Sequence, residues 1–280
     1  MPAVPIAEIV GPASTAGQGI AAFNVIGIEH AEAIVTGAEA AGAPVVLQIS
    51  ENCVAYHGAL KPIGQAALAI AESATVPTAV HLDHATNEEL VREAGCLGFT
   101  SVMFDAANLP YADNVRSTAN MASWCHDRDI WVEAELGEIG GKDGVHAPGA
   151  RTKPDEAATY VDATSVDALA VAVGSSHAMT TRDAVLDIEL IGKIHAAVAV
   201  PLVLHGSSGV PDKALQEAVR AGLTKINIAT QLNKVFTAAV RSHLANDAKV
   251  TDPRRYVAAG RDSIASEVCR LIGLLSGSCT

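Results

Sequence analysis

Residues that could do chemistry follow a short apolar run in the first third of the sequence. The run Thr78–Leu82 ends in Asp83 and His84, and a helical pattern begins after Thr86 and Asn87, either of which could cap that helix. Side chains at such a strand-to-helix junction would face an active-site rim in an α/β barrel. Neighbouring strand residues point to opposite faces, so the strand must open here if both side chains are to share one site. The alternative is a solvated polar strand end.

The same pattern recurs along the chain, where apolar runs of strand length end in residues that could bind or react. These ends hold, in order, Asn24, Ser50, Asp83 with His84, Asp105, Glu135, His177, His205 and Asn227. The runs cover 20–25, 44–49, 78–82, 99–104, 130–135, 168–173, 202–204 and 224–228. Eight strands with helices between them predict a closed (β/α)8 TIM barrel, with its active site at the carboxyl ends of the strands.

The remaining segments fit one barrel domain over residues 1–280. Helical patterns cover 29–41, the segment after Pro62, 110–126, 184–197, 213–221 and 231–244, and extra terminal helices are predicted at 5–18 and 252–275. A barrel of this kind typically takes about 250 residues, close to the 280 of this chain. Aromatic residues are only 4%, so Ala, Val, Ile and Leu must build the core, as suits parallel strands covered on both faces.

Three strand-end histidines, His84, His177 and His205, suggest a metal site. Three imidazoles with an open fourth position describe a catalytic zinc centre, and the carboxylates Asp105 and Glu135 could support or replace a ligand. These histidines lie far apart in the sequence, so spacing alone is only suggestive. The other seven histidines fall on predicted helices, loops or strand interiors, where a surface or core role is favoured over metal binding.

A glycine-rich loop follows the seventh predicted strand. His205-Gly206-Ser207-Ser208-Gly209 leads toward a helix that begins near 210–212. Glycine allows close backbone approach to a ligand, and N–H groups at a helix start attract phosphate. An ordinary strand-to-helix turn would explain the loop alone, but late strands of barrel enzymes commonly hold phosphate.

Composition narrows the partners and the compartment. The net charge of −12 argues against nucleic acid, and an anionic ligand would need a local cationic pocket. We find no apolar run long enough for a membrane span and no signal segment. Five scattered cysteines, an odd number, suggest reduced thiols in a cytoplasmic protein.

Taken together, the motifs resemble those of class II, metal-dependent ketose-bisphosphate aldolases, of the shorter tagatose-bisphosphate type that also includes many fructose-bisphosphate aldolases. The resemblance covers nearly the whole chain, in the family's order. It rests on 22–25 (AFNV), 81–84 (HLDH), 101–105 (SVMFD), 132–137 (VEAELG), 204–209 (LHGSSG), 225–230 (KINIAT) and 252–254 (DPR).

The resemblance implies a role for each matching residue. His84, His177 and His205 match the Zn²⁺ ligands, Asp83 the acid/base at the C4 oxygen, Glu135 a buried carboxylate near the metal and Asp105 a second cation site. Substrate and phosphate contacts are expected from Asn24, Ser50, Gly206, Ser208, Asn227, Thr230 and Arg254. Arg254 matches an arginine that often comes from a neighbouring subunit, which implies a homo-oligomer, either a dimer or a tetramer. A monovalent cation, Na⁺ or K⁺, is also common in the family.

Two segments depart from the family pattern. Ala178 replaces the usual glycine after His177, so the phosphate loop could be rebuilt, with Arg182 adding positive charge. The loop after the fifth strand usually carries a glutamate that moves the C3 proton. Here 140–146 reads GGKDGVH, in which Asp143 is the nearest substitute and His146 the next.

The expected activity is reversible cleavage of a fructose or tagatose 1,6-bisphosphate to dihydroxyacetone phosphate and an aldehyde phosphate. A class II aldolase for a deoxy or sulfonated ketose 1-phosphate, or a non-catalytic accessory barrel, are the alternatives. Lys225 could in principle form a Schiff base, but the three histidines favour the metal route.

Overall fold

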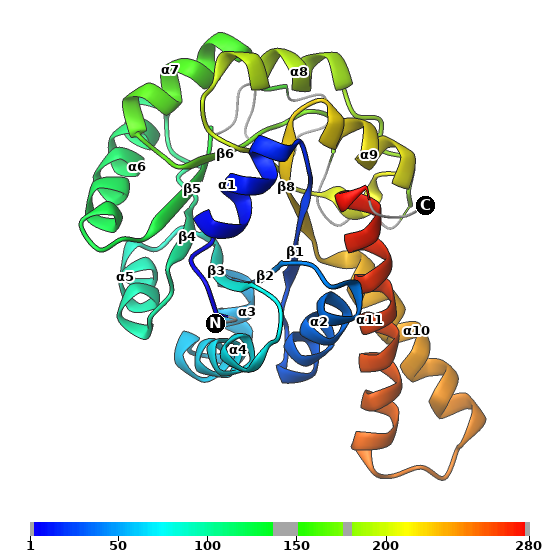
Figure 1. Ribbon diagram of the computed structural model, residues 1–280. Coiled ribbons are helices and arrows are strands. Elements are labelled where there is room, and N and C mark those ends of the chain that lie inside the picture. The colour runs from blue at the N-terminus through cyan, green and yellow to red at the C-terminus, as the bar shows by residue number, and fades with distance from the viewer. Residues whose placement is uncertain (1–2, 137–150, 176–180, 278–280) are drawn as a thin grey trace.

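Eight parallel strands close into a barrel in the order β1 to β8, and helices surround it (Figure 1). The computed structural model describes residues 3–136, 151–175 and 181–277. The strands are β1 (Ile20–Asn24), β2 (Val45–Ser50), β3 (Thr78–Ala85), β4 (Ser101–Phe104), β5 (Trp131–Glu135), β6 (Ala168–Ala170), β7 (Leu202–Leu204) and β8 (Leu223–Ile228). The predicted (β/α)8 TIM barrel is therefore confirmed.

The described helices follow the predicted pattern with two additions. They are α1 (Ala7–Ala16), α2 (Ile28–Ala41), α3 (Glu51–His57), α4 (Leu60–Ser73), α5 (Glu88–Leu97), α6 (Tyr111–His126), α7 (Pro154–Thr164), α8 (Ile188–Ala197), α9 (Asp212–Arg220), α10 (Thr230–Asn246) and α11 (Pro253–Ser276). The sequence patterns missed α3 and α7. α3 has only seven residues, too few for a clear period, whereas α7 carries a recognisable start, Pro154 followed by Asp155 and Glu156.

Small side chains fill the barrel at its amino-terminal end, where α1 packs. Ile6, Ile9 and Val10 belong to a cluster that includes Ala22 from β1 and Ala79 from β3. Figure 1 shows α1 lying across the ring of strands at this end. The predicted N-terminal extra helix thus covers the end of the barrel opposite the strand ends that carry the polar residues.

The predicted C-terminal extra helix is α11, which together with α10 forms a two-helix arm projecting from the barrel (Figure 1). α11 packs closely on α2, because a Cβ at Gly37 would lie 2.5 Å from the carbonyl oxygen of Ala265. This close approach anchors the barrel-proximal part of the arm. Its tip, around Asp252 and Arg254, is solvent-exposed.

Over the described ranges, no helix combines the length and the apolar character that crossing a bilayer would require.

Candidate active site

The end of β3 brings Asp83 and His84 into one site. His84 has φ of +50°, and the pairing of β3 with β4 shifts register between Leu82 and Ala85. A positive φ is uncommon for a residue with a side chain, and such conformations concentrate at functional sites. The irregularity breaks the alternation of the strand, as the sequence required, so both side chains line the same pocket.

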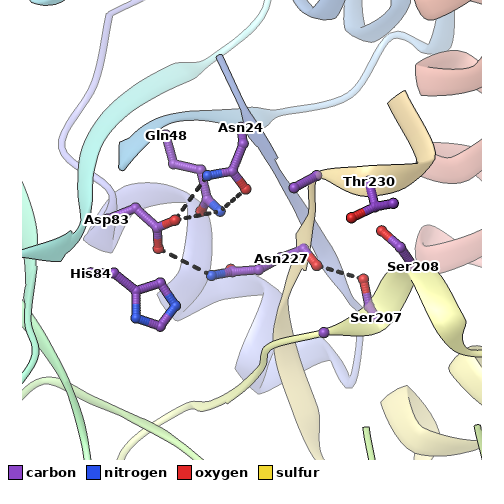
Figure 2. A pocket seen from close by; sticks show the side chains of 10 residues that line it. Asn24, Gln48, Asp83, His84, Ser207, Ser208, Asn227 and Thr230 are labelled. Carbon is purple, nitrogen blue, oxygen red and sulfur yellow. Dashed lines mark hydrogen bonds between the residues drawn. The ribbon is translucent and has the colours of Figure 1, made fainter. Parts of the chain in front are cut away.

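Three side-chain amide groups surround the carboxylate of Asp83. Asn24 Nδ2 donates to Oδ2 at 2.9 Å, Gln48 Nε2 approaches the same oxygen at 3.4 Å, and Asn227 Nδ2 approaches Oδ1 at 3.4 Å. Gln48 also donates to Asn24 Oδ1 at 2.8 Å. Figure 2 shows these amides converging on the carboxylate from β1, β2 and β8. The carboxylate is buried and fixed in orientation at the pocket floor.

The ring of His84 contacts the carboxylate of Asp105. Its Nδ1 is 2.8 Å from Asp105 Oδ2, and Asp105 Oδ1 also accepts the backbone N–H of Ala107 at 3.0 Å. Asp105 therefore fixes the ring of His84, and a cation at the site would meet Nε2. This arrangement of carboxylate and imidazole is common around protein-bound metals.

His205 follows β7 and faces His84. The two ring centroids are 4.5 Å apart at 70°. Nε2 of His205 lies 2.9 Å from Glu133 Oε1, and Nδ1 lies 3.7 Å from Glu135 Oε2. Glu133 thus holds one nitrogen of the ring, while the other is turned toward Glu135.

These side chains could hold a metal ion. Ligand atoms of Asp83, His84 and His205 lie within 4.8 Å of one another, and so do those of His84, Asp105 and Glu135. Two imidazoles, each oriented by a buried or partly buried carboxylate, fit zinc by ligand type. His177, the third predicted ligand, lies outside the described residues.

Electrostatics also favour a cation here. Burial works against a charge on His84, but Asp83, the hydrogen bond to Asp105 and Glu135 outweigh it and raise the pKa of His84 to about 10. Burial, helped by the charge of Asp105, raises the pKa of Glu135 to about 8. The imidazolium of the metal-free chain occupies a strongly negative environment, which a divalent cation would also compensate.

The opposite end of the pocket is formed by a glycine-rich loop and the start of a helix. Gly206, Ser207 and Ser208 line it together with Ala229 and Thr230, where α10 begins (Figure 2). Gly206 has φ of +67°, which lets the backbone turn here, and Ser208 Oγ accepts the N–H of Gln231 at 3.2 Å. N–H groups at the start of a helix attract phosphate. The start of α10 lines this pocket, in addition to the glycine-rich loop that the sequence indicated.

Comparison with known proteins identifies the family. Residues 4–278 match the family model described as class II fructose-bisphosphate aldolase. The chain belongs to this family. It is 38% identical over 272 residues to a fructose-bisphosphate aldolase of Geobacillus stearothermophilus, covering 96% of this chain and 95% of that protein. It is 36% identical to a Staphylococcus epidermidis protein of the same name, with the same coverage.

A solved structure agrees with this assignment. The crystal structure of the YdjI aldolase of Escherichia coli K12 superimposes with a TM-score of 0.88 at 29% identity, covering 99% of this chain and 100% of that one. The protein is thus an aldolase, a carbon–carbon lyase, and the expected family and enzyme class are confirmed.

Three residues expected to bind substrate in this aldolase have other contacts in the structure. Ser50 caps α3, its Oγ accepting the N–H of Cys53 at 3.2 Å. Arg182 donates to the carbonyl of Val210 at 2.7 Å and pairs with Asp212. Arg254 pairs with Asp252 at the exposed arm tip. The pocket lining does not include these three side chains, while Asp143 and His146 lie outside the described ranges.

Four buried polar residues near the aldolase site were not assigned a role from the sequence, apart from the Schiff-base alternative considered for Lys225. They are Gln48, His81, Glu133 and Lys225, each with 0% relative exposure. Lys225 Nζ is enclosed by Glu133 Oε2 and Asn227 Oδ1, both at 2.8 Å. A lysine bound in this way is a poor Schiff-base nucleophile, which supports the metal route over the Schiff-base route.

Proposed function

We propose that the protein is a zinc-dependent aldolase that reversibly cleaves a fructose or tagatose 1,6-bisphosphate to dihydroxyacetone phosphate and an aldehyde phosphate. The observation that supports it is one pocket joining a fixed carboxylate, an imidazole and a phosphate-type loop. Asp83 and His84 lie at one end, and Gly206, Ser208 and Thr230 at the other. The named relatives are fructose-bisphosphate aldolases, which agrees with this substrate class.

His84, His177 and His205 would hold the zinc ion in this proposal. Zinc would withdraw electron density from the substrate ketone and lower the energy of the negative charge that develops when the carbon–carbon bond breaks. Asp105 orients His84 through its Nδ1, as the 2.8 Å contact indicates. It would thus support a ligand, whereas the sequence resemblance assigned it to a second cation site.

Asp83 would take the proton from the C4 hydroxyl. The O–H electron pair then forms the aldehyde carbonyl, the C3–C4 bond breaks, and its electrons stay on the dihydroxyacetone phosphate fragment. Asn24 and Asn227 hold the carboxylate for this transfer through their amide groups. General acid/base help of this kind contributes about 10²–10⁴-fold.

A second proton must reach C3 to complete dihydroxyacetone phosphate. Asp143 is our first candidate and His146 the second, both on the loop outside the described residues. Glu135 is the third, because burial and neighbouring carboxylates raise its pKa to about 8, which suits proton exchange near neutral pH.

The phosphate of the dihydroxyacetone half would bind at Gly206, Ser208, Asn227 and Thr230, with Asn24 near the sugar. Ser50, which caps α3, would act there only through the position of that helix. A monovalent cation, Na⁺ or K⁺, would sit near the loops that follow β6 and β7. Ser175 Oγ donates to the carbonyl of His205 at 2.6 Å, so these two loops are connected. Arg182, through Val210 and Asp212, would support the phosphate loop from behind, in addition to any charge it adds.

Arg254 would bind the far phosphate in a neighbouring subunit, so the protein should be a homodimer or homotetramer. The side chain is 89% exposed at the tip of the α10–α11 arm, where a second copy could receive it.

We expect Arg254→Ala to raise KM for a ketose bisphosphate more than it lowers kcat, since the arginine holds a spectator phosphate. When this variant is mixed with Asp83→Ala and the subunits are exchanged, each mixed dimer should contain one intact site. At low substrate concentration, the activity of the mixture should therefore rise above that of either variant alone. Sedimentation of an active monomer, or no recovery on mixing, would contradict the shared site.

The substrate proposal is tested by cleavage assays with fructose and tagatose 1,6-bisphosphates, with and without a chelator. Dihydroxyacetone phosphate should form from at least one of them and only when metal is present. Ketose 1-phosphates with deoxy or sulfonated far ends form the comparison set. Cleavage of these alone would replace the bisphosphate, and no cleavage of any ketose phosphate would contradict an aldolase acting on such sugars.

A further inference from the structure

A buried ion pair crosses the barrel below the pocket. Lys225 on β8 and Glu133 on β5 come from strands that are not neighbours, and Nζ lies 2.8 Å from Oε2. Both side chains have 0% relative exposure. Removing two charges from water costs several kcal/mol per ion, and well-packed apolar residues are often as stable or more stable. Fold stability alone therefore does not explain why the pair is there.

Each partner of the pair also contacts a residue of the active site. Glu133 uses its other oxygen, Oε1, to bind Nε2 of His205 at 2.9 Å. Lys225 donates a second hydrogen bond to Asn227 Oδ1 at 2.8 Å, and Asn227 Nδ2 points to Asp83. One continuous chain of contacts thus joins the imidazole of His205 to the carboxylate of Asp83.

Donor and acceptor chemistry makes this chain directional. An ammonium group has only donors, so the atom of Asn227 facing Lys225 must be its oxygen, and the NH₂ group must then face Asp83. A carboxylate that already accepts from Lys225 also accepts from His205, so Nε2 of His205 carries the proton and Nδ1 faces the metal site. Lys225 thus imposes the orientation of Asn227, and Glu133 imposes that of His205.

We propose that Lys225 and Glu133 are positioning residues that jointly set the tautomer of His205 and the amide orientation of Asn227. From inside the barrel, they would hold the metal ligand His205 and the proton acceptor Asp83 in fixed positions relative to each other. The inference rests on the proposed zinc-dependent function, and it adds two residues that touch neither substrate nor metal.

The test uses Glu133→Gln, Lys225→Met and the double variant, each as the full-length chain. Zinc affinity is measured without substrate by competition with a chromophoric chelator, and the ligand field by the visible spectrum of the Co²⁺ form. Glu133→Gln should weaken zinc binding about 10–100-fold and change the Co²⁺ spectrum, as losing the partner of a metal ligand does. Lys225→Met should lower kcat about 10–100-fold with little change in KM.

The double variant deals with the possibility that one buried charge without its partner prevents folding. It removes both charges, so it should recover Tm while still binding zinc weakly and turning over slowly. Thr118→Val is the matched control, because that buried hydroxyl on α6 bonds Asn114 and Tyr160. It should lower Tm and leave zinc affinity and the Co²⁺ spectrum unchanged.

Two outcomes would overturn the proposal. One is a fall in Tm with unchanged zinc affinity, Co²⁺ spectrum and kcat, as a purely structural pair would give. The other is a double variant with wild-type zinc affinity and turnover. Failure of the wild-type protein to bind zinc would instead count against the proposed function, so the two failures are distinguishable.

Discussion

Asp83→Ala should lower kcat for sugar-phosphate cleavage by about 10²–10⁴-fold, the usual contribution of a positioned acid/base. KM should change much less, because Asp83 acts on a proton in the transition state and does not hold the substrate in the ground state. Steady-state kinetics with the preferred ketose phosphate check this split between kcat and KM.

Asp83→Asn is the matched variant, because it keeps the size of the side chain while removing its basicity. It should be as impaired as Asp83→Ala, with the fold intact by circular dichroism and zinc still bound. A variant that failed only in KM would move Asp83 from proton transfer to substrate binding. Full activity in Asp83→Asn would remove it from the mechanism.

The barrel and its reacting residues could be predicted from the sequence because both leave periodic signals. Short apolar runs ending in polar residues gave all eight strands, and boundaries differ by a few residues at most, as at β6 (Ala168–Ala170). The chemistry at the end of β3 could also be inferred, including the need for Asp83 and His84 to leave the strand alternation. The positive φ at His84 is the backbone conformation that breaks the alternation of side chains along the strand.

The layer beneath the site was not predicted, although a signal for it exists. His81, Glu133 and Lys225 each precede a recognised site residue by two positions, at Asp83, Glu135 and Asn227. Residues two apart on a strand face the same side, so each lies one layer deeper in the barrel. The sequence cannot say which of them meet, since the contact between Glu133 and Lys225 joins strands far apart in the chain.

Arg182 shows a second limit of prediction from sequence, which concerns the contacts of a long side chain. Its place after the His177 loop suggested a phosphate ligand, yet its guanidinium binds Val210 and Asp212. Arg270 also pairs with Asp212, so two cations share one carboxylate behind the phosphate loop. Local sequence does not encode the direction in which a long flexible side chain extends. The packing of α9 against α11 brings Asp212 and Arg270 together, and Arg182 reaches the same carboxylate from the segment before α8.

Removing the metal should have the largest effect of all. Treatment with a chelator should abolish cleavage, and Zn²⁺ or Co²⁺ should restore it, because the carboxylates around His84 cannot polarise a ketone themselves. His205→Ala and His177→Ala should each lose tight zinc binding, measured as metal content after dialysis. Ser175→Ala is a useful comparison near the same loops, and it should retain zinc.

The pH dependence of zinc binding should have a definite sign. His84 must lose its proton to bind metal, and the neighbouring carboxylates raise the pKa of His84 to about 10 in the metal-free chain. Below that pH, zinc uptake should release this proton, so affinity should fall by about tenfold for each unit of pH lowered. Calorimetry in buffers of different ionisation enthalpy counts the protons released. Zinc affinity that does not change with pH would contradict proton release from His84. Full zinc content and turnover in His177→Ala would contradict the three-histidine site.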